Sequence, residues 1–225
     1  MIESGHNFLG RLWYFRAVSR DRRRLAGGSS GFGANAMKGL RKALFVAALG
    51  AALLVAGGIV AAVAAEPQTV SLSVGDVEFL GDGPNFIDLG VGAFDFIEES
   101  DGSVSAAANV ELRFGEKLFF VGPAIGIVAN TDGSVFGYGG IYADVRYRKF
   151  VVTPLLSLGG LKQGGGKDLG GVFQFRIGLT LAYEFDEGSR LGVRVAHMSS
   201  AGINDRNPGE EEIMLTYTHP FTLAF

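Results

Sequence analysis

Three polar residues near the end of the chain have the types and spacing of a hydrolytic triad. His197 and Ser199 are two residues apart, and Glu211 follows after a polar stretch. Residues two apart on a strand project from the same face, so the imidazole can serve as base for the serine hydroxyl. Glu211 would open the next antiparallel strand and orient the imidazole. Because a histidine, a nearby serine and a later glutamate often coincide, the elements that carry them must decide whether they form a site.

Those elements are expected to be strands. After Glu66 apolar and polar residues alternate, and no stretch has a convincing helical period. Most of the alternating segments reach the ~9–11 residues that a tilted strand needs to cross a bilayer. We expect eight strands, at about 85–98, 103–114, 118–129, 134–148, 150–158, 171–184, 190–199 and 211–225.

A soluble β-sandwich would alternate in the same way, so other features must separate the two folds. The strand count is even, and short turns alternate with generally longer, more polar connections, as in outer-membrane barrels. The chain ends Phe221-Thr222-Leu223-Ala224-Phe225, which resembles the C-terminal signature of bacterial outer-membrane proteins. We therefore expect an all-β fold, an eight-stranded antiparallel transmembrane β-barrel of outer-membrane type. So narrow a barrel is filled by side chains, which argues against a channel.

The parity of the strand 190–199 predicts where the three polar residues point. If its even positions faced lipid, Arg194 would lie in the apolar phase at a cost of ~2–4 kcal/mol near the midplane. The odd positions, His197 and Ser199 among them, are therefore expected on the lipid side. Glu211 shares its parity with Ile213 and the other outward residues of the last strand. With both ends of the mature chain in the periplasm, the strand 190–199 runs outward, and the three residues come to the outer rim.

The chain divides by charge and composition. It has 225 residues and a formal net charge of −3. Residues 1–65 hold nine basic and two acidic residues, whereas the remainder is acidic. Residues 37–65 have the basic start, apolar middle and small-residue end of a signal peptide, with an uncleaved anchor as the alternative. Residues 1–36 are then an upstream extension from a start assigned too early, 66–84 a periplasmic lead-in and 85–225 the barrel. Residues 69–80 also alternate, and a ninth strand there is the alternative to the lead-in.

Composition and local motifs exclude several other functions. The absence of cysteine excludes disulfides and thiolate metal sites, and the 35 glycines have no collagen period. The stretch 159–171 lacks the Ser or Thr of a phosphate-binding loop, because Asp168 stands there, and is interpreted as an outer loop. The arginines before the leader are not taken as a nucleic-acid site. The acidic residues are interpreted as a solvated loop rather than a divalent-cation site: Asp95, Glu98, Glu99 and Asp101.

The stretch from Gly192 to Phe221 resembles a known family. Its H-x-S-x-A-G core and N-P-G-x-E tail are similar to those of the lipid A 3-O-deacylase (PagL-like) family of Gram-negative outer membranes. The resemblance implies an eight-stranded barrel that hydrolyses the ester at the 3-position of lipid A and releases a 3-hydroxy fatty acid. It implies His197 as base, Ser199 as nucleophile and Glu211 as orienting acid, with no metal or other cofactor.

One residue departs from the family pattern. The family usually has Asn directly after the nucleophile, where this chain has Ser200. A weaker oxyanion donor there would lower activity, since the loss of one such donor can cost ~10²–10³ in rate. Oxyanion or supporting roles are expected for Ser200, Ala201, Gly202 and Asn207.

The implied partner is lipid A, or lipopolysaccharide, in the outer leaflet of the cell outer membrane, in which the chain would be a multi-pass protein. A homodimer is left open. The rival hypothesis is a non-catalytic small barrel with a structural or adhesion role.

Overall fold

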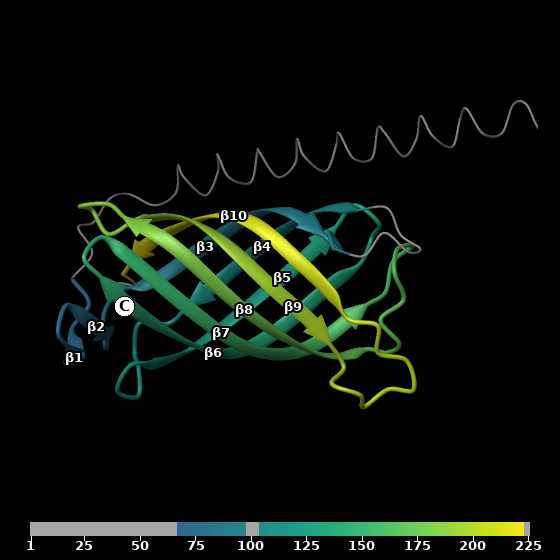
Figure 1. Ribbon diagram of the computed structural model, residues 1–225, viewed down its shortest axis with the longest axis horizontal. Helices are drawn as coiled ribbons and strands as arrows, with labels where there is room; N and C mark the ends of the chain where they lie inside the picture. Colours follow the sequence, from purple (N-terminus) through teal and green to yellow (C-terminus); the bar gives the residue numbers. More distant parts are fainter. Residues whose placement is uncertain (1–66, 98–103, 223–225) are drawn as a thin grey trace, which may run out of the picture. The chain divides into compact units, whose positions relative to one another are not determined.

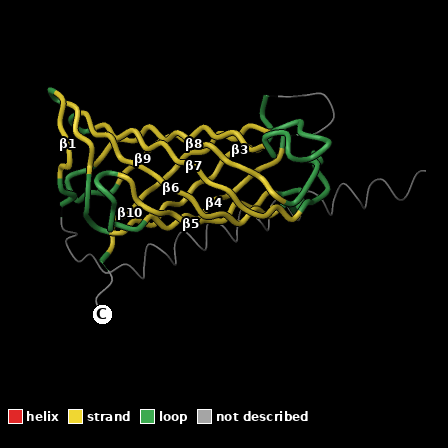
Figure 2. Tube along the Cα trace, turned by 90° about the horizontal axis from the view of Figure 1, so that it is seen from below, coloured by secondary structure: helices red, strands yellow, loops and turns green. Residues whose placement is uncertain are grey.

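The computed structural model describes residues 67–97 and 104–222, and these fold into ten antiparallel strands. Eight of the strands form the wall of a closed barrel, and two short ones precede it (Figures 1 and 2). The short strands are β1 (Val70–Val74) and β2 (Val77–Leu80). The barrel strands are β3 (Asn85–Phe94), β4 (Ser105–Arg113), β5 (Val121–Asn130), β6 (Val135–Tyr147), β7 (Phe150–Lys162), β8 (Phe173–Glu184), β9 (Arg190–Ser199) and β10 (Glu210–Phe221).

The barrel strands pair in sequence order, each with the next, from β3 to β10. The first and last of them also pair, through Asn85 opposite Phe221 to Phe94 opposite Glu212, and this closes the ring. A closed antiparallel barrel leaves no wall strand unpaired, so its backbone is satisfied within a bilayer. The predicted fold class and the eight expected segments are thereby confirmed, with strand ends shifted by a few residues.

Alternate residues of each strand point to opposite sides of the wall, as the sequence pattern predicts. In β9 the side chains of Leu191, Val193 and Val195 are exposed, whereas Arg190 and Arg194 are buried. In β8 the exposed series consists of Phe173, Ile177, Leu179, Leu181 and Tyr183. The barrel is therefore apolar outside and polar inside. That is the polarity of a protein whose solvent is lipid, and the barrel is of outer-membrane type.

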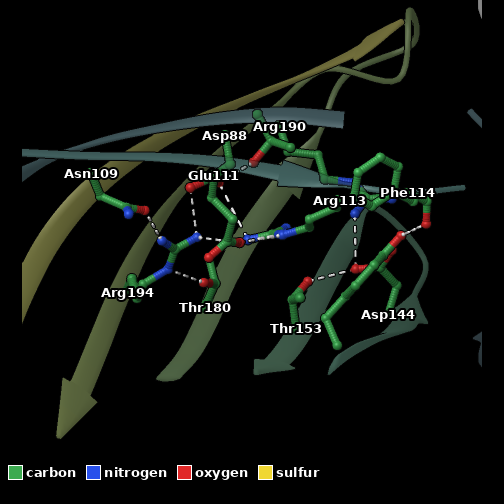
Figure 3. A network of polar contacts seen from close by, with 12 residues as sticks. Asp88, Asn109, Glu111, Arg113, Phe114, Asp144, Thr153, Thr180, Arg190 and Arg194 are labelled. Carbon is green, nitrogen blue, oxygen red and sulfur yellow. Dashed lines mark hydrogen bonds and ion pairs between the residues drawn. The ribbon is translucent and has the colours of Figure 1, made fainter. Parts of the chain in front are cut away.

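A network of buried ion pairs occupies part of the barrel interior (Figure 3). Asp88 accepts hydrogen bonds from Arg113, Arg194 and Thr218, and Glu111 accepts from Arg113 at 2.7 Å. These groups come from β4, β3, β10 and β9, which are four consecutive strands of the closed wall, so the network links neighbouring strands across the point where the ring closes. Full-size side chains occupy the interior, which agrees with the expectation of a filled barrel.

A second part of the network lies nearer the turn end of the barrel, the end at which short turns connect the strands. Asp144 of β6 accepts hydrogen bonds from Lys117 and Thr153 and pairs with Arg190 at 3.1 Å. Gln68, which precedes β1, donates to the same carboxylate at 3.1 Å.

Glycine makes room for large interior side chains in so narrow a barrel. A Cβ at Gly126 of β5 would lie 2.4 Å from the ring of Tyr138 on β6. The freed space lets the Tyr138 hydroxyl donate to Glu111 at 2.6 Å. Most strand glycines, like Gly126, have inward parity.

The segment 69–80 is not a ninth strand of the barrel wall. It folds into the β1–β2 hairpin, whose turn contains Gly75 at φ 62°. The second hairpin strand pairs with the end of β6, from Val77 opposite Tyr147 to Leu80 opposite Asp144. The strand β6 continues past the first residue of β5, and the hairpin pairs with this continuation.

No helix long and apolar enough to span a membrane occurs in residues 67–97 or 104–222. The predictions for residues 1–36 and 37–65 lie outside the described residues, as do Glu98, Glu99, Asp101 and the terminal Leu223-Ala224-Phe225. Asp95 is described, and the interpretation as a solvated residue is wrong for it: it is buried and pairs with Lys167 of the β7–β8 loop at 3.1 Å.

Removal of Arg194 should weaken the barrel strongly. Its guanidinium donates to Asp88, Asn109 and Thr180 in the interior. Arg194→Ala leaves buried carboxylates without their partner, which we expect to cost about 3–5 kcal/mol of unfolding free energy. The folded fraction, measured by heat-modifiable gel mobility across a urea series, gives this value.

The matched control is the exposed ion pair between Lys149 and Asp186, in which the Lys149 ammonium lowers the pKa of the Asp186 carboxyl. Water and salt screen an exposed pair, so it contributes little to stability and Lys149→Ala should scarcely move the urea midpoint. Equal midpoints for the two variants would contradict a stabilising interior network.

Candidate active site

The strongest feature of the site is a hydrogen-bonded pair on two neighbouring strands. His197 of β9 lies directly opposite Glu211 of β10 in the ladder, so both side chains leave the same face of the sheet. The imidazole Nδ1 lies 3.2 Å from the Glu211 Oε1. Both side chains are partly exposed, at 49% and 31%, on the outer surface of the barrel. This pairing orients the ring and directs its Nε2 away from the carboxylate.

Ser199 follows His197 on the same outward face and is the last residue of the strand. Its side chain is half-buried, and Phe175 of β8 is its cross-strand neighbour. Among the described residues no hydrogen bond joins Ser199 Oγ to His197 Nε2. Catalytic hydrogen bonds are often long without substrate and tighten when it binds. The structure thus brings His197 and Glu211 into contact and places Ser199 beside them without a direct bond.

The loop after Ser199 is held by the side-chain amide of Asn207. Asn207 Oδ1 accepts two hydrogen bonds from Ser200, one from its backbone N–H at 2.8 Å and one from its hydroxyl at 3.0 Å. Ser200 is completely buried. Its hydroxyl therefore lies on the opposite side of the chain from the outward His197 and Ser199, and it links the two ends of the 200–209 loop.

Two residues with positive φ follow Ser200. Ala201 has φ 52° and Gly202 has φ 77°. A non-glycine residue in this region is uncommon, and such strain often marks a functional site. In the described part of the chain, the backbone N–H groups of Ala201 and Gly202 have no acceptor, whereas that of Ile203 donates to Ser200. These two groups are available to a ligand beside Ser199.

Gly209 packs against the imidazole, which the sequence reasoning missed. It has φ 68°, and a Cβ there would lie 2.8 Å from His197 Cε1 and 3.4 Å from Nε2. The signal was the N-P-G-x-E tail, in which the glycine precedes the strand by one residue. Only a residue without a side chain lets the loop return so close to the histidine ring.

The two glutamates beside Glu211 point into the barrel. Glu212 is completely buried and pairs with Arg176 of β8 at 2.6 Å. Glu210 is also buried, and its Oε2 lies 3.4 Å from the backbone nitrogen of Asp95. Of these three acidic residues, Glu211 is the one on the outward face beside His197.

The surface next to the site is apolar. Phe173, Phe175 and Ile177 share the outward face of β8, and the two phenylalanine rings meet edge to face at 5.1 Å. Ile177 lies opposite His197 in the ladder. Such a wall suits an acyl chain rather than a polar substrate. Within residues 67–97 and 104–222, no group of three or more His, Asp or Glu is arranged to hold a metal ion.

A family model described as lipid A 3-O-deacylase (PagL) matches residues 85–220, which include all of the barrel except its last strand residue, and all the site residues. The chain belongs to this family. The match confirms the resemblance seen in the Gly192–Phe221 stretch, and it begins only after the β1–β2 hairpin.

The similarity to individual proteins is more limited. The lipid A deacylase PagL of Bordetella bronchiseptica is 40% identical over 55 residues, which is 24% of this chain and 31% of that protein. The matched region thus spans about a third of the relative's length. Among solved structures, the outer membrane enzyme PagL is 17% identical with a TM-score of 0.46, covering 60% of this chain and 99% of that one. A designed transmembrane β-barrel is 9% identical with a TM-score of 0.42, covering 62% of this chain and 97% of that one.

Asn207 should control the order of the loop that follows Ser199. Asn207→Ala removes the acceptor of two hydrogen bonds, each contributing about 1 kcal/mol. We expect the Ser200 amide to exchange with deuterium roughly fivefold to thirtyfold faster. Asn207→Asp keeps an acceptor oxygen and should retain most of the protection, as followed by hydrogen-exchange mass spectrometry. Equal exchange in the wild type and Asn207→Ala would show that the contact does not hold the loop.

Proposed function

We propose that the chain is an outer-membrane lipid A 3-O-deacylase, a serine esterase that uses Ser199, His197 and Glu211. The observation that carries the proposal is the His197–Glu211 hydrogen bond on the outward face of the barrel, with Ser199 on the same face. Polar side chains on a lipid-facing surface are costly and are usually functional. Family membership supplies the substrate class.

The position of the site suits a substrate that stays in the membrane. The site lies at the end of the barrel that carries the 163–172 and 200–209 loops, and in outer-membrane barrels the longer loops are extracellular. The outer leaflet there contains lipopolysaccharide. Because the three side chains face sideways, a lipid A molecule can present its 3-linked acyl ester by lateral diffusion, without entering the barrel.

The chemistry follows from the roles of the three residues. Glu211 accepts a hydrogen bond from the Nδ1–H of His197 and so leaves Nε2 as the base. Nε2 takes the proton of Ser199, whose Oγ attacks the ester carbonyl. The protonated imidazole then gives its proton to the departing 3-oxygen of the sugar, leaving an acyl-serine. Water, deprotonated by His197, attacks the acyl-serine and releases a 3-hydroxy fatty acid.

The oxyanion is assigned to backbone donors in this proposal. Ala201 and Gly202 lie two and three residues after the nucleophile, and neither backbone amide is used within the described chain. Ser200 serves as a positioning residue, since both its N–H and its hydroxyl are engaged by Asn207. Backbone donors fixed before the reaction stabilise developing charge without reorganisation.

Loss of the nucleophile or the base should abolish deacylation. We expect Ser199→Ala and His197→Ala each to lower activity by at least about 10³-fold, and Glu211→Gln by roughly 10²–10⁴-fold. Mass spectrometry of lipid A from cells that express each variant measures the loss of the 3-linked acyl chain. The matched control is Glu210→Gln, an adjacent isosteric change whose side chain points into the barrel.

Heat-modifiable gel mobility must first show that each variant is folded in the membrane. An inserted wild-type protein that leaves lipid A unchanged would overturn the proposed activity and favour the non-catalytic barrel. A Ser199→Ala variant as active as the wild type would overturn the triad alone.

Gly209→Ala should impair the histidine without unfolding the barrel. The added methyl group would lie 2.8 Å from His197 Cε1, so the ring must move. A displacement of about 1 Å in a catalytic group can cost about 10²-fold in rate, and we expect a loss of that order. Gly133→Ala is the control because Gly133 also has positive φ, at 87°, but nothing lies within 4 Å of an added Cβ. Equal activities of the two variants in the lipid A assay would contradict the packing role of Gly209.

A further inference from the structure

The β1–β2 hairpin carries an apolar face that the barrel does not need for its own closure. Pairing in the hairpin places Leu72 opposite Phe79 and Val74 opposite Val77. Cross-strand partners leave the same face of a sheet, so these four side chains form one surface. Leu72 and Val74 are 50% and 65% exposed. The opposite face is polar, with Ser73 paired to Glu78.

This face continues the lipid-facing surface of the barrel. Phe79 lies opposite Val145 of β6, and Val77 lies opposite Tyr147, both of which have outward parity. Glu78 points the other way, because it pairs with the half-buried Arg146 at 2.8 Å. The hairpin therefore adds its apolar residues to the outside of the wall.

The β4–β5 turn adds further apolar residues at the same place. Leu118 and Phe119 are about three-quarters exposed, at 77% and 76%. Phe119 also has φ 59°, an unfavourable conformation for an aromatic residue. The ring of the next residue, Phe120, packs on the ring of Phe79, with 5.3 Å between the two ring centroids. In water, such a group of exposed apolar side chains would be unfavourable.

The cluster is held rigidly. The hydroxyl of Ser71 donates to the carbonyl of Phe119 at 2.6 Å, and Asp82 accepts from the backbone of Lys117 at 2.7 Å. The Lys117 ammonium reaches inward to the Leu80 carbonyl at 3.1 Å. The hairpin and the turn are thus fixed to each other and to the barrel, and their exposed face is part of the folded structure.

We propose that this cluster, formed by Leu72, Val74, Val77, Phe79 and residues 118–120, inserts into the membrane leaflet at the turn end of the barrel. Short turns are periplasmic in outer-membrane barrels, so this is the inner leaflet, and the partner is lipid. Continuity with the lipid-facing wall carries the assignment. Aromatic residues are also typical of the level where acyl chains meet headgroups. The family match starts at residue 85, so the hairpin lies outside the matched residues.

Bromolipid quenching of single tryptophans tests this contact. The sole tryptophan, Trp13, is replaced by Phe in the full chain, and one tryptophan is placed at Val74 or at Phe119. The protein is reconstituted in bilayers with brominated or ordinary acyl chains. Leu179→Trp, on the outward face of β8, is the reference for lipid contact, and Ser73→Trp is the matched control on the other hairpin face.

The inserted cluster predicts that bromolipid lowers the fluorescence at positions 74 and 119 within about twofold of the loss at position 179, and several-fold more than at position 73. Leu72→Trp repeats the test if Val74→Trp does not fold. Equal, weak quenching at positions 73 and 74 would overturn the proposal. Shielding of position 74 from aqueous acrylamide without bromolipid quenching would also overturn it, because a protein partner or a second copy would then cover the face.

Discussion

The buried charges of the barrel determine where its chemistry can occur. Arg190 and Arg194 of β9 are held inside by carboxylates from other strands, Asp144 and Asp88. Because strand side chains alternate strictly, these two inward arginines force His197 and Ser199 outward. A slip of one residue would expose both guanidinium groups to lipid and bury the apolar stripe. The outward direction of the site is therefore a consequence of electrostatics deep in the barrel.

The same constraint acts on the partner strand of β9. Arg176 of β8 binds Glu212 inside the barrel, and Glu212 fixes the parity of β10. Its neighbour Glu211 must then face outward, directly opposite His197. Ion pairs inside the barrel thus fix the direction of the side chains on both strands, and this places the His197–Glu211 hydrogen bond on the outside. This explains how a polar pair can be placed reproducibly on a surface that otherwise contacts lipid.

Much of this arrangement is predictable from the residues because alternation is a local property. The eight strands, the inward arginines and the choice of Glu211 over its neighbours all follow from parity along single segments. The hairpin does not follow in this way: residues 69–80 alternate as one strand, and only the turn at Gly75, with φ 62°, divides them. The strand β7 also extends to Lys162, beyond the expected end at 158, since Gly159 and Gly160 remain paired with β6 and β8.

Contacts made by loops were the least predictable part of the site. The packing of Gly209 on His197 depends on the path of residues 200–209, for which alternation gives no rule. The same is true of Ser200. From the sequence, its hydroxyl was a candidate oxyanion donor in place of the usual Asn of the family. Its burial and its two hydrogen bonds to Asn207 favour a different role, in which residue 200 holds the loop closed.

That role changes what the substitution at position 200 would cost. An oxyanion donor acts directly on the reacting atoms, and its loss is felt as a factor of ~10²–10³ in rate. A loop-closing hydrogen bond acts through the position of the Ala201 and Gly202 amides, and one such bond contributes about 1 kcal/mol. Serine provides the bond here with a shorter side chain than asparagine. In the proposed mechanism the backbone amides of Ala201 and Gly202 supply the electrostatic stabilisation, and Ser200 contributes by holding the loop that positions them.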